Sequence, residues 1–136
     1  MKRFFKNPTR ENFRMTYLKR PDSKYHTAPI DQRTRDGITF ASKGEMYRYI
    51  ELKLKQKAGE IKDLELQPRY ELIPQFTDWK GEKYNSITYV ADFRYYEVVT
   101  KRIVVEDFKG YETDVFKLKE KMLRHKYPDL DFRIII

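Results

Sequence analysis

Residues 89–110 limit most strongly which fold this chain can adopt. Their alternation of apolar and polar side chains predicts two β-strands that fold back on each other. If the hairpin turns about Val99 and Thr100, Asp92 lies directly across from Asp107, with the two Cβ atoms roughly 5 Å apart. Each strand then has one face that holds the following residues: Thr88, Val90 and Asp92 in the first strand, and Ile103, Val105, Asp107 and Lys109 in the second.

Two carboxylates this close repel each other, so a half-buried sheet retains them only if something offsets the repulsion. The usual offsets are a shared proton, a bound cation or a neighbouring ammonium group. Lys109 supplies an ammonium group on the face of Asp107. The spacing Asp-x(14)-Asp-x-Lys therefore predicts a site that can hold a divalent metal ion beside a positive donor.

The register of the hairpin decides which acid faces Asp92. Val-Thr is a poor two-residue turn, so a longer loop could shift the pairing. A slip of one residue would place Glu106 opposite Asp92 and turn Asp107 and Lys109 to the other face. Glu106 is therefore the alternative second acid.

The chain has 136 residues, which is typical of one domain with one site. Its net charge of +8 is concentrated at the N-terminus, since residues 1–36 hold ten Lys and Arg against four Asp and Glu. We predict a basic arm at 1–30 and a folded domain at 31–136. A basic arm with interleaved aromatic rings suits a polyanion such as DNA, and a solvated tail without a binding role is the alternative. The DNA-contacting residues that we expect are Lys2, Arg3, Lys6, Arg10, Arg14, Lys19, Arg20, Lys117, Lys119, Lys121 and Arg124.

Several classes of protein lack support in the sequence. There is no cysteine, no apolar run of the roughly 20 residues that span a membrane, and no apolar signal segment, so we expect a soluble cytoplasmic protein. The motifs of nucleotide-binding loops, zinc proteases and serine hydrolases are absent from the sequence. Most aromatic residues follow strand alternation, which is typical of a core rather than of a base-stacking platform.

A helix is predicted between Ser42 and Gly59, because the run Ser-Lys-Gly-Glu at its start has the form of a capping box. One broad arc of this helix holds its apolar residues, which are Met46, Tyr49, Ile50, Leu52 and Leu54. Glu45 falls inside the same arc. It is either the reciprocal cap or a third acidic ligand that the helix delivers to Asp92 and Asp107, and the spacing alone favours the cap.

Further elements follow from the same patterns. Residues 38–40 read as a short extended piece after an Asp-Gly turn, and residues 61–75 as two strands broken at Gln67-Pro68. Thr113 can cap a helix to Lys126, and residues 131–136 form a last strand. We expect the inward face of this helix to hold Val115, Leu118, Met122 and Leu123. Strand, helix and strand then form a right-handed βαβ crossover. The predicted fold class is α/β, with a mixed sheet and an antiparallel central hairpin flanked by two helices.

With these residues in place, the chain resembles the PD-(D/E)XK nuclease superfamily, and more closely a phage and prophage family of small resolvase-like endonucleases. The resemblance covers about residues 35–133 and rests on these segments: DGITFASKGEMYRYIEL, AGEIKDLELQPRYELIP, ITYVADF, VVEDFKG and TDVFKLKEKMLRHKYPD. It implies a restriction-endonuclease-like core and hydrolysis of DNA phosphodiester bonds with Mg²⁺, for which Mn²⁺ is expected to substitute. Branched, recombination or replication DNA of a phage is the implied substrate, in a phage-infected or lysogenic bacterial host.

The resemblance also implies roles for single residues. Asp92 and Asp107 match the two acids and Lys109 matches the lysine, while Glu45 matches a helix-borne acid, which favours its role as a ligand. Metal ligands are then Asp92, Asp107, Glu45 and the carbonyl of Phe108, with Gln67 as possible support.

Two positions depart from the pattern of the superfamily. Ala91 stands in place of the proline in the superfamily name, and Asp107 stands where Glu is commoner. Lys109 would either orient and deprotonate the attacking water or stabilise the developing charge.

The assembly follows from the size of the chain. Because paired cuts suit two-fold symmetry and one chain is small, we expect a homodimer on DNA. The alternative function is a catalytically silent protein that binds DNA structure on the same fold.

Overall fold

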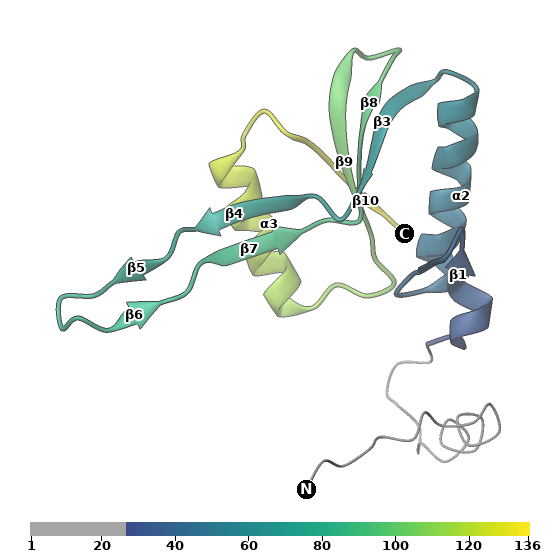
Figure 1. The fold of residues 1–136 in the computed structure, drawn as a ribbon. Coiled ribbons are helices and arrows are strands. Elements are labelled where there is room, and N and C mark those ends of the chain that lie inside the picture. The colour runs from purple at the N-terminus through teal and green to yellow at the C-terminus, as the bar shows by residue number, and fades with distance from the viewer. Residues whose placement is uncertain (1–26) are drawn as a thin grey trace, which may run out of the picture.

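The computed structural model describes residues 27–136, and it is built around a four-stranded sheet in the order β10-β9-β8-β3 (Figure 1). The bounds are β3 Ile61–Leu66, β8 Phe93–Glu97, β9 Arg102–Phe108 and β10 Asp131–Ile135. Strands β3, β8 and β9 pair antiparallel, whereas β10 pairs parallel to β9. The predicted mixed sheet with an antiparallel central hairpin is confirmed.

Two helices, α2 (Lys43–Lys57) and α3 (Asp114–Lys126), pack against the sheet and create two separate apolar clusters. Alternation along β9 divides its side chains between them, since Val104 belongs to the α2 cluster and Val105 to the α3 cluster. The helices therefore cover opposite faces of the sheet. Neither is long and apolar enough to cross a membrane, within the part of the chain that the structure describes.

Helix α2 begins where the sequence predicts, because the side chain of Ser42 accepts a hydrogen bond from the backbone N–H of Glu45 at 3.1 Å. Its buried face consists of Glu45, Met46, Tyr49 and Leu52. The prediction for Leu54 is wrong, since its side chain is 62% exposed. It lies about 200° around the helix from Leu52, beyond the stripe that the sheet covers.

A short N-terminal unit precedes α2. It consists of the 3-10 helix η1 (Ile30–Arg33) and the two-residue strands β1 (Thr34–Arg35) and β2 (Ile38–Thr39). Asp36 and Gly37 make the turn between these strands with positive φ angles of 52° and 75°. The predicted turn and extended piece are therefore confirmed.

Helix α3 connects β9 to the parallel strand β10, so the predicted βαβ connection is confirmed. Thr113 caps the helix, with its side chain accepting from the backbone N–H of Phe116 at 3.1 Å. The predicted inward face is wrong in part, because Val115 and Leu118 are exposed while Phe116 and Leu123 are buried. Phe116 offers more apolar area than Val115, so burying the stripe of Phe116 and Leu123 is favoured.

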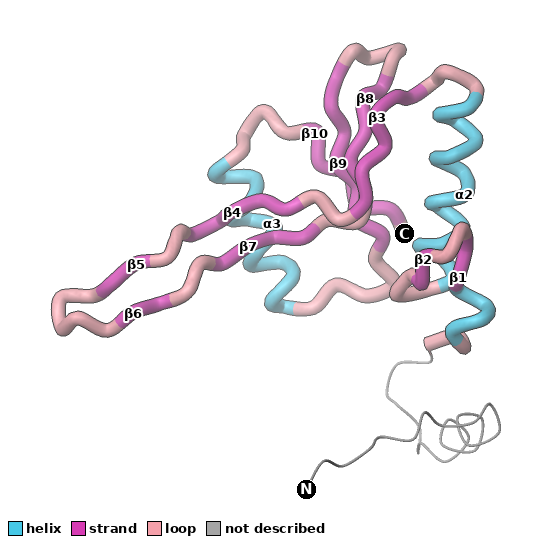
Figure 2. The backbone as a smooth tube through the Cα atoms, viewed as in Figure 1, coloured by secondary structure: helices cyan, strands magenta, loops and turns pink. Residues whose placement is uncertain are grey.

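A long two-stranded ribbon continues β3 and β8 beyond the sheet (Figure 2). Strand β4 (Arg69–Ile73) pairs with β7 (Ile87–Val90), and β5 (Phe76–Thr77) pairs with β6 (Lys83–Tyr84). The break at Gln67-Pro68 is confirmed, and a matching break occurs opposite it at residues 91–92. The first strand of the predicted hairpin is therefore two strands, β7 and β8.

This break overturns the predicted face of the first strand. Thr88 and Val90 do not lie on the same face as Asp92. Val90 is exposed to solvent, whereas Tyr89, which lies between Thr88 and Val90 in the chain, is the buried residue of β7. The rotation of β7 relative to β8 at Ala91 accounts for the difference, because strict alternation holds only within one uninterrupted strand.

The register of β8 and β9 is the predicted one. Phe93 pairs with Glu106 and Glu97 pairs with Arg102, so the same register places Asp92 opposite Asp107. A four-residue loop at 98–101 replaces the two-residue turn and is centred on the same point.

Glu106, the alternative acid, points to the α2 face of β9 and is fully buried. Arg48 of α2 binds it in a bidentate pair, with Nε to Oε2 at 2.8 Å and Nη2 to Oε1 at 2.5 Å. The hydroxyl of Tyr95 donates a further hydrogen bond to Oε1. This ion pair joins α2 to the central strand and leaves Glu106 unavailable to a site on the other face.

Arg48→Ala should therefore destabilise the fold strongly, because it leaves the Glu106 carboxylate buried without a counter-charge. We expect a loss of about 3–5 kcal/mol in the free energy of unfolding, measured by urea titration. Arg94→Ala is the matched control, since Arg94 pairs with Glu65 on the surface at 3.6 Å, where such a pair contributes about 1 kcal/mol or less. Equal small losses in both variants would contradict this role of Arg48.

Candidate active site

Asp107 lies at the centre of the candidate site, on the α3 face of β9 with 1% of its surface exposed. Its Oδ2 atom accepts a hydrogen bond from the Tyr89 hydroxyl and forms an ion pair with Lys109 Nζ at 3.0 Å. Its Oδ1 atom is buried without a hydrogen-bond partner in the described residues. A buried acceptor that lacks a partner is costly, so this oxygen is suited to a ligand that brings positive charge.

Asp92 is held by three backbone groups, two of them in β9 and one just after β3. Its Oδ2 atom accepts from the backbone N–H of Phe108 at 2.6 Å, and its own N–H donates to the carbonyl of Glu106 at 3.1 Å. Its carbonyl accepts from the N–H of Gln67 at 2.9 Å. The carboxylate is thus fixed beside β9 at the point where the ribbon breaks.

Burial raises the pKa of Asp92 well above its ordinary value of 3.8. Interaction with the neighbouring Asp107 carboxylate raises this pKa further, as does the charge of Glu45, whereas the hydrogen bond from Phe108 lowers it. Without a cation, Asp92 and Asp107 are therefore stabilised by a proton on Asp92, which is one of the three offsets expected from the sequence.

Glu45 lies in the first turn of α2 and is 8% exposed. Burial raises its pKa most, and a backbone hydrogen bond at Ala41 opposes this. The charge of Asp107 also raises this pKa, and those of Lys109 and Arg33 lower it. The carboxylate of Glu45 is therefore within electrostatic range of Asp107 and Lys109, while its backbone N–H takes part in the helix cap.

Gly44 explains how the start of α2 comes so close to the end of β9. A Cβ atom at this position would lie 2.3 Å from two carbons of the Phe108 ring, so only glycine allows this contact. The ring of Phe108 thereby fixes the first turn of α2, and with it Glu45, against the strand that carries Asp107. The structure gives Phe108 this packing role, and its role as a carbonyl ligand stays a prediction.

Lys109 is fixed at both ends. Its backbone N–H donates to the carbonyl of Ile135 at 2.8 Å, and its ammonium group lies 4.8 Å from the ring centroid of Phe116. The side chain is 28% exposed. The ammonium group therefore faces both Asp107 and solvent, where a substrate phosphate could reach it.

Sequence reasoning missed Tyr89, whose hydroxyl binds Asp107. Burial and the hydrogen bond to Asp107 raise the pKa of the Tyr89 phenol far above its ordinary value, so it remains a donor. Its alternation with Thr88 and Val90 predicts a core residue on the opposite face, and only the break before β8 brings it to Asp107. The Asp-x-Lys pattern itself gave no signal for it.

The other predicted site residues lie further out. Gln67 occupies the turn between β3 and β4 with a φ of 52°, and it supports Asp92 through its backbone rather than its exposed side chain. The predicted DNA-contacting residues of the arm, from Lys2 to Arg20, lie outside the described residues.

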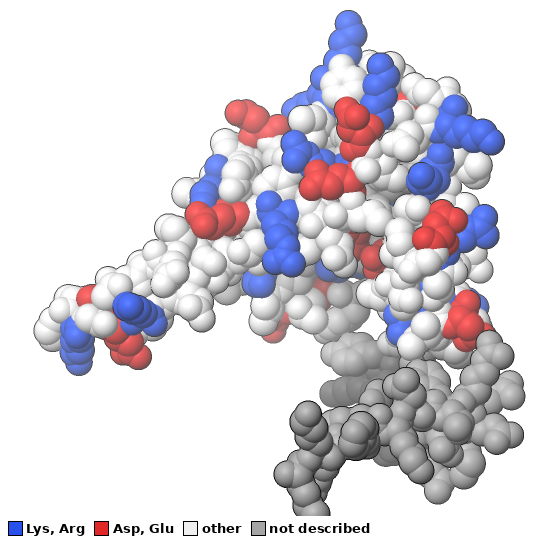
Figure 3. Space-filling model, in the orientation of Figure 1, with Lys and Arg blue, Asp and Glu red and all other residues white. Residues whose placement is uncertain are grey.

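The four DNA-contacting cations predicted on α3 differ in whether their side chains already have a partner in the structure. Lys117 and Lys121 are exposed, while Lys119 Nζ lies 3.4 Å from the carbonyl of Thr88. Arg124 pairs with Glu120 at 3.0 Å. Figure 3 shows cations and acids interspersed over the face that it presents.

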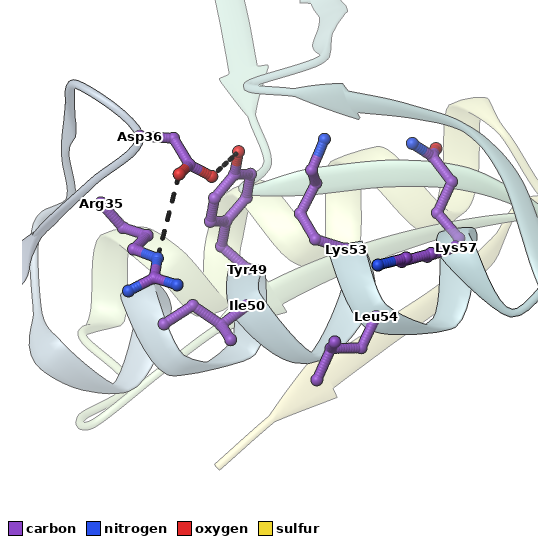
Figure 4. Close-up of a pocket in the computed structure, with 8 residues that line it drawn as sticks. Arg35, Asp36, Tyr49, Ile50, Lys53, Leu54 and Lys57 are labelled. Atoms are coloured by element: carbon purple, nitrogen blue, oxygen red, sulfur yellow. Dashed lines mark hydrogen bonds and ion pairs between the residues drawn. The ribbon is translucent and has the colours of Figure 1, made fainter.

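A pocket lies elsewhere, between the β1–β2 turn and α2 (Figure 4). The Tyr49 hydroxyl donates to Asp36 Oδ2 at 3.0 Å, and Arg35 Nε lies 3.9 Å from Asp36 Oδ1. Lys53 and Lys57 border the pocket. None of the predicted catalytic residues lines it, so the acidic cluster formed by Glu45, Asp92 and Asp107 is the better candidate site.

The donor chemistry of the acidic cluster fits a hard divalent cation, since Mg²⁺ and Mn²⁺ prefer carboxylate oxygens. Asp107 Oδ1 is the oxygen that such an ion would satisfy. Among residues 27–136, however, no three Asp, Glu or His side chains stand close enough to hold a metal ion as they are. Glu45 would have to approach the two aspartates to complete the set.

Residues 22–136 match the model of a family described as "Protein of unknown function (DUF1064)". No curated protein and no solved structure matches the chain.

Asp92→Asn should change how stability depends on pH in a metal-free buffer. Because the pKa of Asp92 is higher in the folded state than in the unfolded state, protonated Asp92 contributes to the free energy of unfolding. This contribution is fully present below about pH 4 and is lost as the pH rises through the folded pKa. The variant stays neutral and keeps an oxygen for the Phe108 amide. We therefore expect the free energy of unfolding of the variant, relative to that of the wild type, to increase as the pH rises above 4. The increase should be at most about 1.4 kcal/mol for each pH unit.

Urea titrations from pH 4 to pH 9 in EDTA measure this difference. Asp129→Asn is the control, because Asp129 is exposed in the loop between α3 and β10. If both variants follow the wild-type profile in parallel, Asp92 does not carry the proton that we assign to it.

Proposed function

This chain belongs to the DUF1064 family, and we propose that it is a divalent-metal-dependent endonuclease that hydrolyses phosphodiester bonds in DNA. The observation that carries the proposal is the buried Oδ1 atom of Asp107, which has no partner among the described residues. Its carboxylate lies opposite Asp92 in the hairpin register and pairs with Lys109 through Oδ2. This combination offers oxygen ligands for Mg²⁺ and a positive donor for a phosphate within one site.

The order of the elements supports the same proposal. A hairpin, β8–β9, carries Asp92 just before its first strand and Asp-Phe-Lys at the end of its second. The preceding helix brings Glu45 to the end of that second strand, and a βαβ crossover follows. This arrangement agrees with what the resemblance to PD-(D/E)XK nucleases implies for a restriction-endonuclease-like core.

In this mechanism Asp92 and Asp107 would hold the cation, and Glu45 would complete the acidic ligands. When bound, Mg²⁺ supplies Lewis-acid stabilisation of the charge that develops at the phosphate and lowers the pKa of bound water. Asp92 would release its proton to solvent when it serves as a ligand, since a metal ligand must be deprotonated. Tyr89 fixes the orientation of the Asp107 carboxylate through Oδ2.

Lys109 is the residue best placed to act on the substrate. Its ammonium group is held between the Asp107 carboxylate and the ring of Phe116 and remains partly exposed. From this position it can orient the attacking water or stabilise the negative charge of the transition state. Either role uses a donor that is already in place before the reaction.

We further propose that the substrate is branched, recombination or replication DNA of a phage. Lys117 and Lys121 on α3 and the basic arm would contact phosphates, and a homodimer would place two sites on two strands.

One observation favours a second candidate function, a DNA-structure-binding protein without catalysis. As described, the acidic side chains do not form a three-ligand metal set, and Asp107 Oδ2 already has two donors. A protein of this kind would use the same basic surfaces and need no metal.

Lys109→Met should separate binding from chemistry. The variant keeps an apolar side chain over Phe116 but removes the ammonium group, so DNA binding should change little. Cleavage should slow by about 10²–10³-fold, the loss typical of one transition-state donor. Single-turnover cleavage of duplex, single-stranded, flap and four-way DNA with Mg²⁺ or Mn²⁺ measures the effect.

Lys57→Met is the matched control, because Lys57 is an exposed lysine in the last turn of α2, at the opposite end of that helix from Glu45. A normal cleavage rate for Lys109→Met would remove Lys109 from the active site. Wild-type protein that binds four-way DNA yet cleaves none of these substrates with either metal would instead be the silent binding protein.

A further inference from the structure

The β-ribbon ends in a tip, residues 76–84, that projects away from the sheet and both helices (Figure 1). It carries the only tryptophan of the chain, Trp79, whose surface is 90% exposed. Phe76 and Tyr84 stack across the two strands with centroids 4.9 Å apart and planes at 12°, and both are exposed by more than 40%. Large aromatic surfaces left in water in this way indicate a binding surface.

The ribbon tip is built as a rigid turn. Asp78 Oδ1 accepts from the backbone N–H groups of Lys80 and Glu82, both at 2.9 Å. The N–H of Gly81 donates to the carbonyl of Asp78 at 3.0 Å, and Gly81 has a φ of 86°. Trp79 is therefore presented on an ordered loop, which lowers the entropy lost on binding.

The base of the ribbon is fastened to α3 and to the candidate site. The Tyr127 hydroxyl donates to the carbonyl of Glu71 at 3.0 Å, and its ring packs edge-on against Tyr70 at 5.3 Å. On its other strand, β7 ends at Val90, just before Ala91 and Asp92 in the chain. The backbone N–H of Ala91 donates a hydrogen bond to the carbonyl of Pro68, so the two strands of the ribbon meet beside Asp92. The ribbon tip is thus connected to the acidic cluster by two short ladders, β4–β7 and β5–β6, over roughly ten residues, about 30 Å at 3.3 Å per residue.

From these features we propose that the ribbon tip stacks on unpaired bases of nucleic acid, with Trp79 as the principal stacking surface. Flat aromatic rings bind bases of any sequence through their faces. The ammonium group of Lys80 lies 5.1 Å from the Trp79 ring, where it can pair with the phosphate next to a stacked base. Lys83 adds a second cation on the adjacent strand.

The charge of the ribbon tip distinguishes this surface from a general phosphate-binding patch. Lys80 and Lys83 are balanced by Asp78 and Glu82, so the tip carries no net charge to attract duplex DNA. Stacking must then supply the affinity, which selects exposed bases over a closed double helix. This inference rests on the proposed function, and it assigns to that site DNA that contains unpaired bases at the reach of the ribbon, about 30 Å from the cut.

Because Trp79 is the only tryptophan, its fluorescence reports on the ribbon tip directly. Titration of the full chain in EDTA with an oligothymidylate of about 20 nucleotides should quench the emission to saturation. A blunt duplex of the same length should leave the emission nearly unchanged at the same concentration. EDTA prevents cleavage, so the result does not depend on catalysis.

Trp79→Ala should weaken binding of the oligothymidylate by about 10-fold or more in fluorescence anisotropy of a labelled strand. Trp79→Phe, which keeps a stacking ring, should recover most of the affinity. Tyr111→Ala is the control, since Tyr111 is also exposed but lies between β9 and α3.

Equal quenching by duplex and single strand, or unchanged affinity in Trp79→Ala, would overturn the inference. Quenching that depends on protein concentration without nucleic acid would also overturn it, by making a second copy of the chain the partner of the tip. Cleavage of duplex DNA by Trp79→Ala at the wild-type rate would leave the proposed nuclease function standing in either case.

Discussion

Two carboxylates face each other across the β8–β9 hairpin, and the folded chain must offset their repulsion in an environment that excludes most water. Asp107 is buried and its Oδ2 atom is bound by Tyr89 and Lys109, while Asp92 accepts from the backbone of β9. Burial and, after it, the neighbouring Asp107 carboxylate raise the pKa of Asp92, so a proton on Asp92 completes the balance in the absence of a cation. A divalent ion would replace that proton and satisfy Asp107 Oδ1, so the same interaction connects stability with the proposed chemistry.

Other parts of the structure hold this pair in place. The ion pair of Arg48 and Glu106 joins α2 to β9 on the opposite face, and the contact of Gly44 with Phe108 fixes the start of α2. These contacts bring Glu45 toward the aspartates while its backbone closes the helix cap. Two neighbouring acids on one strand thus have separate tasks, because alternation sends Glu106 to the core and Asp107 to the site.

Much of this arrangement could be predicted from the sequence, because it depends on local rules. The register of Asp92 and Asp107 follows from alternation and the position of the loop, and the caps at Ser42 and Thr113 follow from short patterns. The break between β7 and β8 could not be predicted, because it depends on how β4 pairs at a distance. It brings Tyr89 to Asp107 and exposes Val90.

Which face of a helix is buried could likewise not be predicted fully from the sequence. Periodicity alone allowed two adjacent apolar stripes on α3, and only packing against Leu72, Tyr89 and Phe132 selects the stripe of Phe116 and Leu123. Likewise, the aromatic residues that line the core and those at the ribbon tip have similar patterns in the sequence. Their difference lies in the length of the ribbon, which carries Trp79 beyond the core.

Calorimetric titration of the metal-free protein with Mn²⁺ at pH 7 tests most directly whether the acidic cluster is a cation site. We predict saturable binding by the wild type, with a heat that changes with the ionisation enthalpy of the buffer because Asp92 releases its proton. Asp107→Asn should bind at least about 10-fold more weakly, since a neutral amide replaces a charged ligand. No saturable heat from folded wild-type protein, or equal binding by Asp107→Asn, would contradict the account.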